Sequence, residues 1–143
     1  MKPIIILLSL ISTYSVFAQN ETLAYNYFSD QGVEINITEE TCSDIKYGIE
    51  KQILIIELKN NNNYPVKISF HKDSWYDNKC TSCNSNSKEF LVEEVLLPNS
   101  TIKGNCSPEK KFLTIFKKML NLEKVKQLSK YEFKNINIEK VNQ

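Results

Sequence analysis

The sequence predicts an all-β fold, an antiparallel β-sandwich of about seven strands with one short helix near the C-terminus. Three observations predict it: segments that alternate apolar and polar residues with period two, clusters of turn-forming residues between them, and very little convincing helical spacing. Alternation of this kind places one face of each strand in a core and the other in water. A chain of such strands buries its apolar faces most simply between two sheets.

The strongest strand signal lies at the centre of the chain, at residues 52–59, where apolar side chains occupy both faces. A strand of this type is expected to be central and covered on both sides. The other expected strands are 23–27, 33–37, 66–70, 89–97, 100–103, 111–117 and 131–141. Two of them carry a slip in their alternation, at Glu93-Glu94 and near Asn135, and each slip predicts a β-bulge.

Residues 111–128 are ambiguous, because both faces of the segment are apolar while part of its spacing is helical. We expect a strand over 111–117, followed by a short helix over 122–128 that Asn121 caps. A helix through this region is the alternative.

The first 18 residues have the pattern of a secretory signal peptide. Lys2 supplies the positive charge, residues 4–11 are almost continuously apolar, and Ala18 ends a small-residue cleavage site. The apolar run is too short for a transmembrane helix, which needs about 20 residues. We therefore expect a leader over 1–18, a single β-sandwich domain over 19–143, no membrane span after cleavage, and a secreted or periplasmic location; a retained signal anchor is the alternative.

The charge balance argues against two classes of partner. The chain has 18 basic and 17 acidic residues, and every basic one is Lys. Proteins that bind nucleic acids or anionic membranes carry an excess of positive charge. The composition therefore argues against a nucleic-acid partner and against a role that depends on anionic lipid.

Four cysteines, Cys42, Cys80, Cys83 and Cys106, lie in segments that are expected to be loops; for Cys42 this is the polar segment 38–44. In an immunoglobulin-like sandwich successive strands run in opposite directions, so alternate loops share one end. All four thiols are expected to gather at that end. An exported chain with an even number of cysteines forms disulfides by default, and the sequence leaves the pairing open.

Two other readings of the cysteines remain open. A closed zinc site is one, since Cys80 and Cys83 have the spacing of one arm of such a site. A redox-active dithiol is the other, but that chemistry favours a first cysteine at a helix N-terminus. Here the polar residues 84–87 follow and favour a loop. We predict structural disulfides, with no metal and no other cofactor.

Candidate contact residues lie on either side of the strand at 66–70. The turn before it consists of four asparagines, Asn60, Asn61, Asn62 and Asn63, and the segment after it contains Trp75 and Tyr76. Exposed, the two aromatic residues could form a platform for a sugar or peptide; our preferred expectation is that Trp75 is buried and supports the cysteine loops. His71, the only histidine, is expected to be a solvated surface residue.

Three runs and a cysteine pair carry a resemblance: ILIIELKNNNNYPVKISF, then Cys80 and Cys83, then LLPNSTIKGNC and LTIF. In this pattern residues 46–141 resemble small secreted immunoglobulin-like sandwich proteins of AT-rich bacteria. The resemblance implies an immunoglobulin-like fold and export, and it implies no activity. The chain departs from antibody-type domains, because Trp75 follows Cys42 by 33 residues, too far for the usual inter-sheet disulfide and its packed tryptophan.

The sequence predicts an exported, non-enzymatic binding or structural module that disulfides stabilise. Its expected partner is another exported protein or a surface glycan. No nucleophile–base set, phosphate-binding loop or histidine-containing metal motif is recognisable in the sequence. The alternatives are a thiol–disulfide oxidoreductase that uses Cys80 and Cys83, and an inhibitor of a secreted hydrolase that acts through the turn at 60–63.

Overall fold

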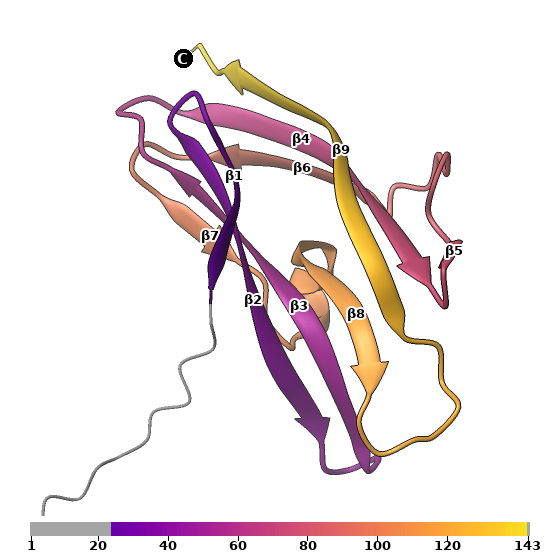
Figure 1. Cartoon of the computed structure of the whole chain (residues 1–143). Coiled ribbons are helices and arrows are strands. Elements are labelled where there is room, and N and C mark those ends of the chain that lie inside the picture. Colours follow the sequence, from indigo (N-terminus) through magenta and orange to yellow (C-terminus); the bar gives the residue numbers. More distant parts are fainter. Residues whose placement is uncertain (1–23, 143) are drawn as a thin grey trace, which may run out of the picture.

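The computed structural model describes residues 24–142, which form two antiparallel sheets that face each other (Figure 1). The larger sheet contains β1 (Tyr25–Asp30), β2 (Val33–Asp44), β3 (Ile49–Asn60), β7 (Thr101–Lys103) and β8 (Thr114–Met119). The smaller sheet contains β4 (Val66–Tyr76), β5 (Lys79–Cys80), β6 (Leu91–Leu96) and β9 (Leu128–Lys140). The predicted all-β class is confirmed, with nine strands in the described part of the chain. The expected leader, residues 1–18, lies outside the described residues.

Strand β3 is the centre of the larger sheet, as its apolar pattern predicts. It pairs with β2 along its whole length, and its other edge pairs first with β8 and then with β7. Side chains on both of its faces are buried from Ile53 to Ile56. Between the sheets, the core combines residues of both: Val33, Ile35, Ile37, Leu54, Ile56 and Leu58 with Val66, Ile68, Phe70, Val92, Leu96 and Phe133.

Strand β2 is much longer than predicted. Residues 38–44 continue the strand and pair with β3 as far as Asp44 and Ile49, so the expected loop is wrong. Residues 38–44 have mostly polar side chains, and they stay in the strand because their backbone bonds β3. The composition of the segment itself does not indicate that β3 is its partner. Cys42 consequently lies on a strand and is buried.

One of the two predicted bulges is confirmed. The pairing of β4 with β9 shifts opposite Phe70, and Asn135 has a positive φ of 54° at that point. The other is wrong, because β4 and β6 pair without interruption. Val92 and Leu96 face the core there, whereas Val95 is exposed on the outer face. The exposed Val95 therefore mimicked a shift in the apolar–polar alternation of the strand.

The ambiguous segment contains a strand and a short helix in the opposite order from the one predicted. The 3-10 helix η1 (Pro108–Leu113) comes first, and β8 follows it. The strand is confirmed over 114–117, whereas no helix forms over 122–128 and Asn121 caps none. Asn121 instead bonds the β2–β3 turn: its Nδ2 donates to Gly48 O and its Oδ1 accepts from Glu50 N. No helix among residues 24–142 is long and apolar enough to cross a membrane.

The cysteines form two separate disulfides, Cys42–Cys106 and Cys80–Cys83. The first joins β2 to the segment between β7 and η1, and the second closes a tight loop beside β5 in the other sheet. The expected loop position of Cys42 is therefore wrong, and the gathering of all four cysteines at one end stays a prediction. A four-sulfur zinc site is also not formed, since each sulfur is bonded to another one.

Candidate functional site

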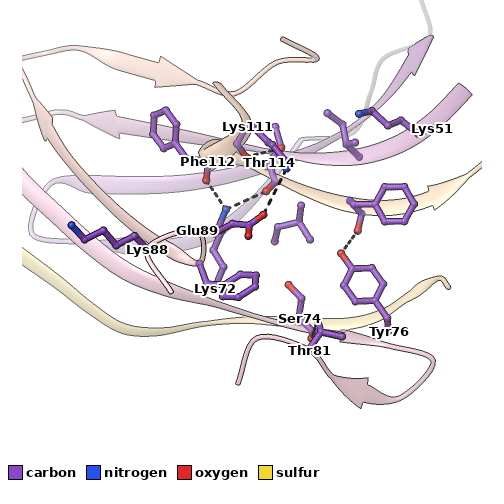
Figure 2. Close-up of a pocket in the computed structure, with 14 residues that line it drawn as sticks. Lys51, Lys72, Ser74, Tyr76, Thr81, Lys88, Glu89, Lys111, Phe112 and Thr114 are labelled. Atoms are coloured by element: carbon purple, nitrogen blue, oxygen red, sulfur yellow. Dashed lines mark hydrogen bonds and ion pairs between the residues drawn. The ribbon is translucent and has the colours of Figure 1, made fainter. Parts of the chain in front are cut away.

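The candidate site is a cleft at one edge of the sandwich, where the two sheets are not closed against each other (Figure 2). It encloses a cavity of about 350 Å³. Strand β4 forms one wall, η1 and β8 form the opposite wall, and residues 88–90 lie at the side. Its apolar lining consists of Ile53, Phe90, Phe112, Ile115 and Phe116.

The cleft exists because the inward face of β4 changes its chemistry halfway along the strand. Its first inward residues are apolar and end at Phe70, which is buried in the core. Lys72, Ser74 and Tyr76 continue the same face toward the cleft. Because side chains alternate along a strand, these three replace aliphatic packing at this end of the sandwich. The two sheets are joined here by polar side chains instead of by packed apolar side chains.

Two of those side chains, Lys72 and Tyr76, bond backbone carbonyls of η1 and β8. Lys72 Nζ donates to the carbonyl oxygens of Phe112 (2.7 Å) and Thr114 (3.3 Å). Tyr76 Oη donates to the carbonyl oxygen of Phe116 (2.7 Å). Thr114 and Phe116 are alternate residues of β8, so their carbonyls share the edge of that strand that is not paired with β3, whereas the Phe112 carbonyl belongs to the end of η1. Edge carbonyls of this kind need a partner when they are shielded from water.

Lys72 is the unusual group of the cleft. The residue is only 6 % exposed, and burial lowers the pKa of its ammonium from 10.5 to about 8. Glu89 acts in the opposite direction and raises the pKa of Lys72, while Lys111 lowers it further. Among residues 24–142 no carboxylate forms an ion pair with Lys72. A positive charge therefore lies in the wall of a largely apolar cavity with carbonyl dipoles as its partners.

Charged side chains line the cleft, and apart from the buried Lys72 and the half-buried Lys51 they are exposed. Lys51, Lys88 and Lys111 all line it, and Glu89 is the one acidic residue among the lining side chains. Glu89 pairs with Lys111 across 3.6 Å. Burial raises the pKa of the Tyr76 hydroxyl to about 12, so this group stays a neutral donor at physiological pH. The cleft as a whole is positively charged.

The asparagine turn is a structural network. Asn60 is 1 % exposed, and its Nδ2 donates to the carbonyls of Tyr64, Leu96 and Leu97. Its Oδ1 accepts from both nitrogens of Asn62. The prediction that Asn60 belongs to a contact surface is therefore wrong, because its side chain is buried. For Asn61, Asn62 and Asn63, and for the inhibitor hypothesis that uses this turn, contact with a partner stays a prediction.

The two aromatic candidates lie on opposite faces of β4. Tyr76 lines the cleft. Trp75 points to the outer face, where it is half-buried and Lys130 Nζ lies 4.6 Å from the centre of its ring. Its backbone partner across the ladder is Cys80, so Trp75 does lie beside a disulfide. The structure does not combine Trp75 and Tyr76 into one platform.

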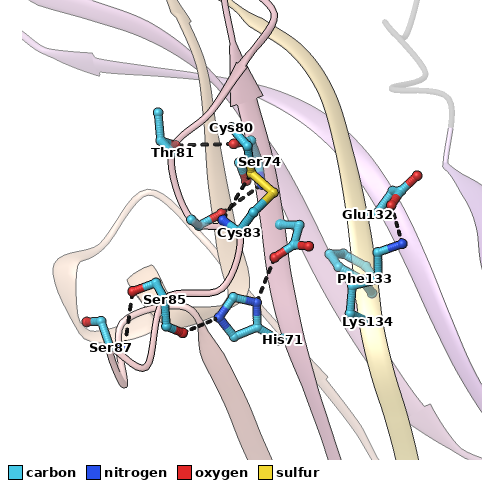
Figure 3. Close-up of polar contacts among 12 residues, drawn as sticks. His71, Ser74, Cys80, Thr81, Cys83, Ser85, Ser87, Glu132, Phe133 and Lys134 are labelled. Atoms are coloured by element: carbon cyan, nitrogen blue, oxygen red, sulfur yellow. Dashed lines mark hydrogen bonds and ion pairs between the residues drawn. A yellow bond between two sulfur atoms is a disulfide. The ribbon is translucent and has the colours of Figure 1, made fainter.

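His71 is not a solvated surface residue. Its Nδ1 lies 2.8 Å from Asp73 Oδ1 and its Nε2 lies 3.0 Å from the carbonyl oxygen of Ser85, and the side chain is 19 % exposed (Figure 3). The loop that carries Ser85 lies against His71 on the outer face of β4 (Figure 3), and nothing in its Asn- and Ser-rich composition indicates that position. We therefore correct the expectation for His71.

The Cys80–Cys83 disulfide joins the last residue of the two-residue strand β5 to the turn that follows it. The feature that a thioredoxin-type site needs, a helix beginning at the first cysteine, is not present in this part of the described chain. One contact suits thiol chemistry, however: the Cys83 backbone N–H donates to Cys80 Sγ across 3.0 Å. Ser82, between the cysteines, is fully buried, and its Oγ accepts from Ser74 N (2.8 Å).

Sequence reasoning missed the cleft and Lys72. A signal was present, because Lys72 continues the period-two series of Val66, Ile68 and Phe70 and so had to face inward. Among the described residues, no group of three or more His, Cys, Asp or Glu side chains could hold a metal ion. Comparison of the chain with protein-family models, with curated proteins and with solved structures found no match.

Proposed function

We propose that this protein is an exported, non-enzymatic binding module, and that its ligand occupies the cleft between β4 and β8. The observation that carries the proposal is the cavity of about 350 Å³ with a mainly apolar lining and a few convergent polar groups. Ligand sites of proteins commonly have this character, with volumes of roughly 300–1,000 Å³. The ligand is a small molecule or a group of similar size on a partner, such as the exported protein or surface glycan that the sequence suggests.

Two features support export and stability. Disulfides persist in oxidising compartments and are rare in the cytosol, and this chain has two. The leader pattern at 1–18 suggests the same destination, secreted or periplasmic. The immunoglobulin-like resemblance stays a prediction about the arrangement of the strands.

A screen of small molecules by protein-observed NMR tests the proposal. We expect at least one compound to bind saturably and to shift signals of Ile53, Ile115 and Tyr76 first. Ser74→Leu partly fills the cavity and should abolish that binding, because Ser74 lines the cleft and is 7 % exposed. Ser69→Leu makes the same change on the outer face of β4 and should leave it intact. The proposal would be contradicted if the Ser74→Leu variant bound the compound as well as the wild-type protein does, or if the screen found no compound that binds saturably.

A second candidate function is thiol–disulfide exchange at Cys80 and Cys83. The Cys83 N–H that points at Cys80 Sγ would stabilise a Cys80 thiolate once the bond is reduced. If this function is real, the protein catalyses the reduction of insulin by dithiothreitol and Cys80→Ser abolishes the activity. An inert wild-type protein would eliminate this candidate.

A further inference from the structure

We propose that the cleft binds a small organic carboxylate with an apolar body, and that Lys72 is the counter-ion of its head group. This inference rests on the proposed function, because it names the chemical class of the ligand for the same cleft. It goes beyond that function by assigning the polar and apolar ends of the ligand to particular residues.

The first step concerns the charge of Lys72. An ammonium has three N–H donors, and the carbonyls of Phe112 and Thr114 accept from two of them. One donor is left for the cavity that Lys72 lines. A buried cation is costly unless an anion accompanies it, and no carboxylate within residues 24–142 is at ion-pair distance from Lys72; Glu89, which raises its pKa, pairs with Lys111 instead. A ligand anion would complete the site.

The second step concerns the field at the mouth. Lys51, Lys88 and Lys111 line the cleft together with Lys72, against the single carboxylate of Glu89. The whole chain, by contrast, has a formal net charge of only +1. The positive charge is therefore concentrated at the cleft, and a cleft of one sign attracts ligands of the other. Cationic ligands are repelled for the same reason.

The third step concerns the body of the ligand. Phe90, Phe112, Phe116 and the two isoleucines Ile53 and Ile115 supply an apolar lining. A fully polar anion such as inorganic phosphate leaves this surface without a partner, whereas a hydrocarbon chain covers it. The cavity of about 350 Å³ lies at the small end of ordinary ligand sites, which favours a medium-length chain over a long one. Octanoate has the required combination of head and body.

Lys72 also has a purely structural task, because its bonds to Phe112 and Thr114 join the two sheets. If that were its whole role, the charge of the ligand would not matter. The two possibilities therefore differ in a measurable way, namely in the preference of the cleft for an anion over a neutral molecule of the same length.

The experiment compares octanoate, octan-1-ol, octylammonium and inorganic phosphate by calorimetric and NMR titration of the oxidised wild-type protein. We expect octanoate to bind roughly tenfold or more tightly than octanol, because a charged hydrogen bond is added to the same hydrocarbon contact. Octylammonium and phosphate should not bind measurably. Lys72→Met should reduce the affinity for octanoate to that for octanol. Lys67→Met, on the outer face of β4, is the matched control and should change neither.

A measurement on the wild-type protein covers the case in which Lys72→Met does not fold. The titration of Lys72, followed by the NMR signal of its Cε, should move to higher pH in saturating octanoate and should not move in octanol. The charged or titratable groups around it are Glu89, Lys111, Lys51, Lys88 and Tyr76, and all are the same in both titrations.

The outcomes separate the two proposals. Equal affinities for octanol and octanoate, with no shift of Lys72, would overturn the carboxylate assignment and leave ligand binding in the cleft standing. Absence of binding by both would overturn the carboxylate assignment as well. The proposed function would be overturned as well only if the broader screen also found no ligand whose binding Ser74→Leu abolishes.

Discussion

At the scale of single residues, two buried polar side chains decide how the sheets are joined. Asn60 bonds three carbonyls at the closed end of the sandwich, and Lys72 bonds two at the open end. Both are polar residues in places where a strand pattern predicts apolar ones. Buried polar groups are tolerated when their hydrogen bonds are complete, and each of these two organises a turn or a strand edge that would otherwise lack partners.

The Asn60 network predicts that Asn60→Ala is strongly destabilising. The substitution removes one donor group from the carbonyls of Tyr64, Leu96 and Leu97 and leaves Asn62 without its acceptor. We expect a loss of about 2 to 3 kcal/mol in the free energy of unfolding, measured in urea. Asn63→Ala is the control, because Asn63 is exposed and should lose less than about 0.5 kcal/mol. Similar losses in both variants would contradict the assignment.

Burial of Lys72 predicts that stability rises with pH in a defined window. The pKa of Lys72 is about 8 in the fold and 10.5 in the unfolded chain, so between these values the unfolded chain binds more protons. The free energy of unfolding should therefore increase by about 2 kcal/mol from pH 8 to pH 10, relative to Lys72→Met. Above pH 10 the raised pKa of Tyr76 acts in the opposite direction. Urea titrations at a series of pH values test this, and parallel curves for wild type and Lys72→Met would refute it.

At the scale of elements, the two disulfides constrain very different lengths of chain. Cys42–Cys106 links residues 64 apart and fixes the segment before η1 to β2, whereas Cys80–Cys83 links residues 3 apart. In the chain-entropy model a cross-link stabilises more when the loop it closes is longer. The long bridge should therefore dominate the contribution of disulfides to stability.

Paired substitutions test this difference. Replacing Cys42 and Cys106 together by Ala should lower the free energy of unfolding by about 4 kcal/mol, and replacing Cys80 and Cys83 together should lower it by about 2 kcal/mol. Denaturant titrations of the two double variants give the comparison directly. A larger loss for the Cys80 and Cys83 pair would show that the short bridge holds the loop over β4 in some further way.

Elements whose own side chains carry the pattern were predictable from the sequence. The core strand around Ile55 and the bulge at Asn135 are of this kind, because alternation and its interruption are local properties. The polar end of β2 was not predictable, since its partner β3 holds it in the sheet. The loop position expected for Cys42 failed for the same reason. The cleft depends on where β8 lies relative to Lys72, which is a tertiary fact that no local pattern contains.

At the scale of the whole molecule, the sandwich is closed at one end and open at the other. The closed part has apolar side chains of both sheets in contact, and β2 is paired on both edges, with β1 and β3. At the open part β8 pairs with β3 alone, and the carbonyls of Thr114 and Phe116 on its other edge accept hydrogen bonds from Lys72 and Tyr76 of β4. Local stability follows buried apolar contact and completed ladders, so β8 should open before β2.

Hydrogen exchange tests that order. Backbone amides of β8 should exchange faster than those of the part of β2 that contains Ile35 and Ile37.

Tyr76→Phe removes the hydroxyl that bonds the carbonyl of Phe116, and we expect it to speed exchange in β8 and to lower the free energy of unfolding by about 1 kcal/mol. Tyr131→Phe is the matched control: the buried Tyr131 hydroxyl has no hydrogen-bond partner in the described structure, so its removal should not speed β8 exchange. A ligand in the cleft touches both walls and should slow β8 exchange while leaving β2 unchanged. Equal effects of the two tyrosine variants would show that the Tyr76 hydroxyl does not hold β8. Uniform exchange across the two strands would mean that the cleft edge is as firmly closed as the core, and a ligand would then have no opening through which to enter.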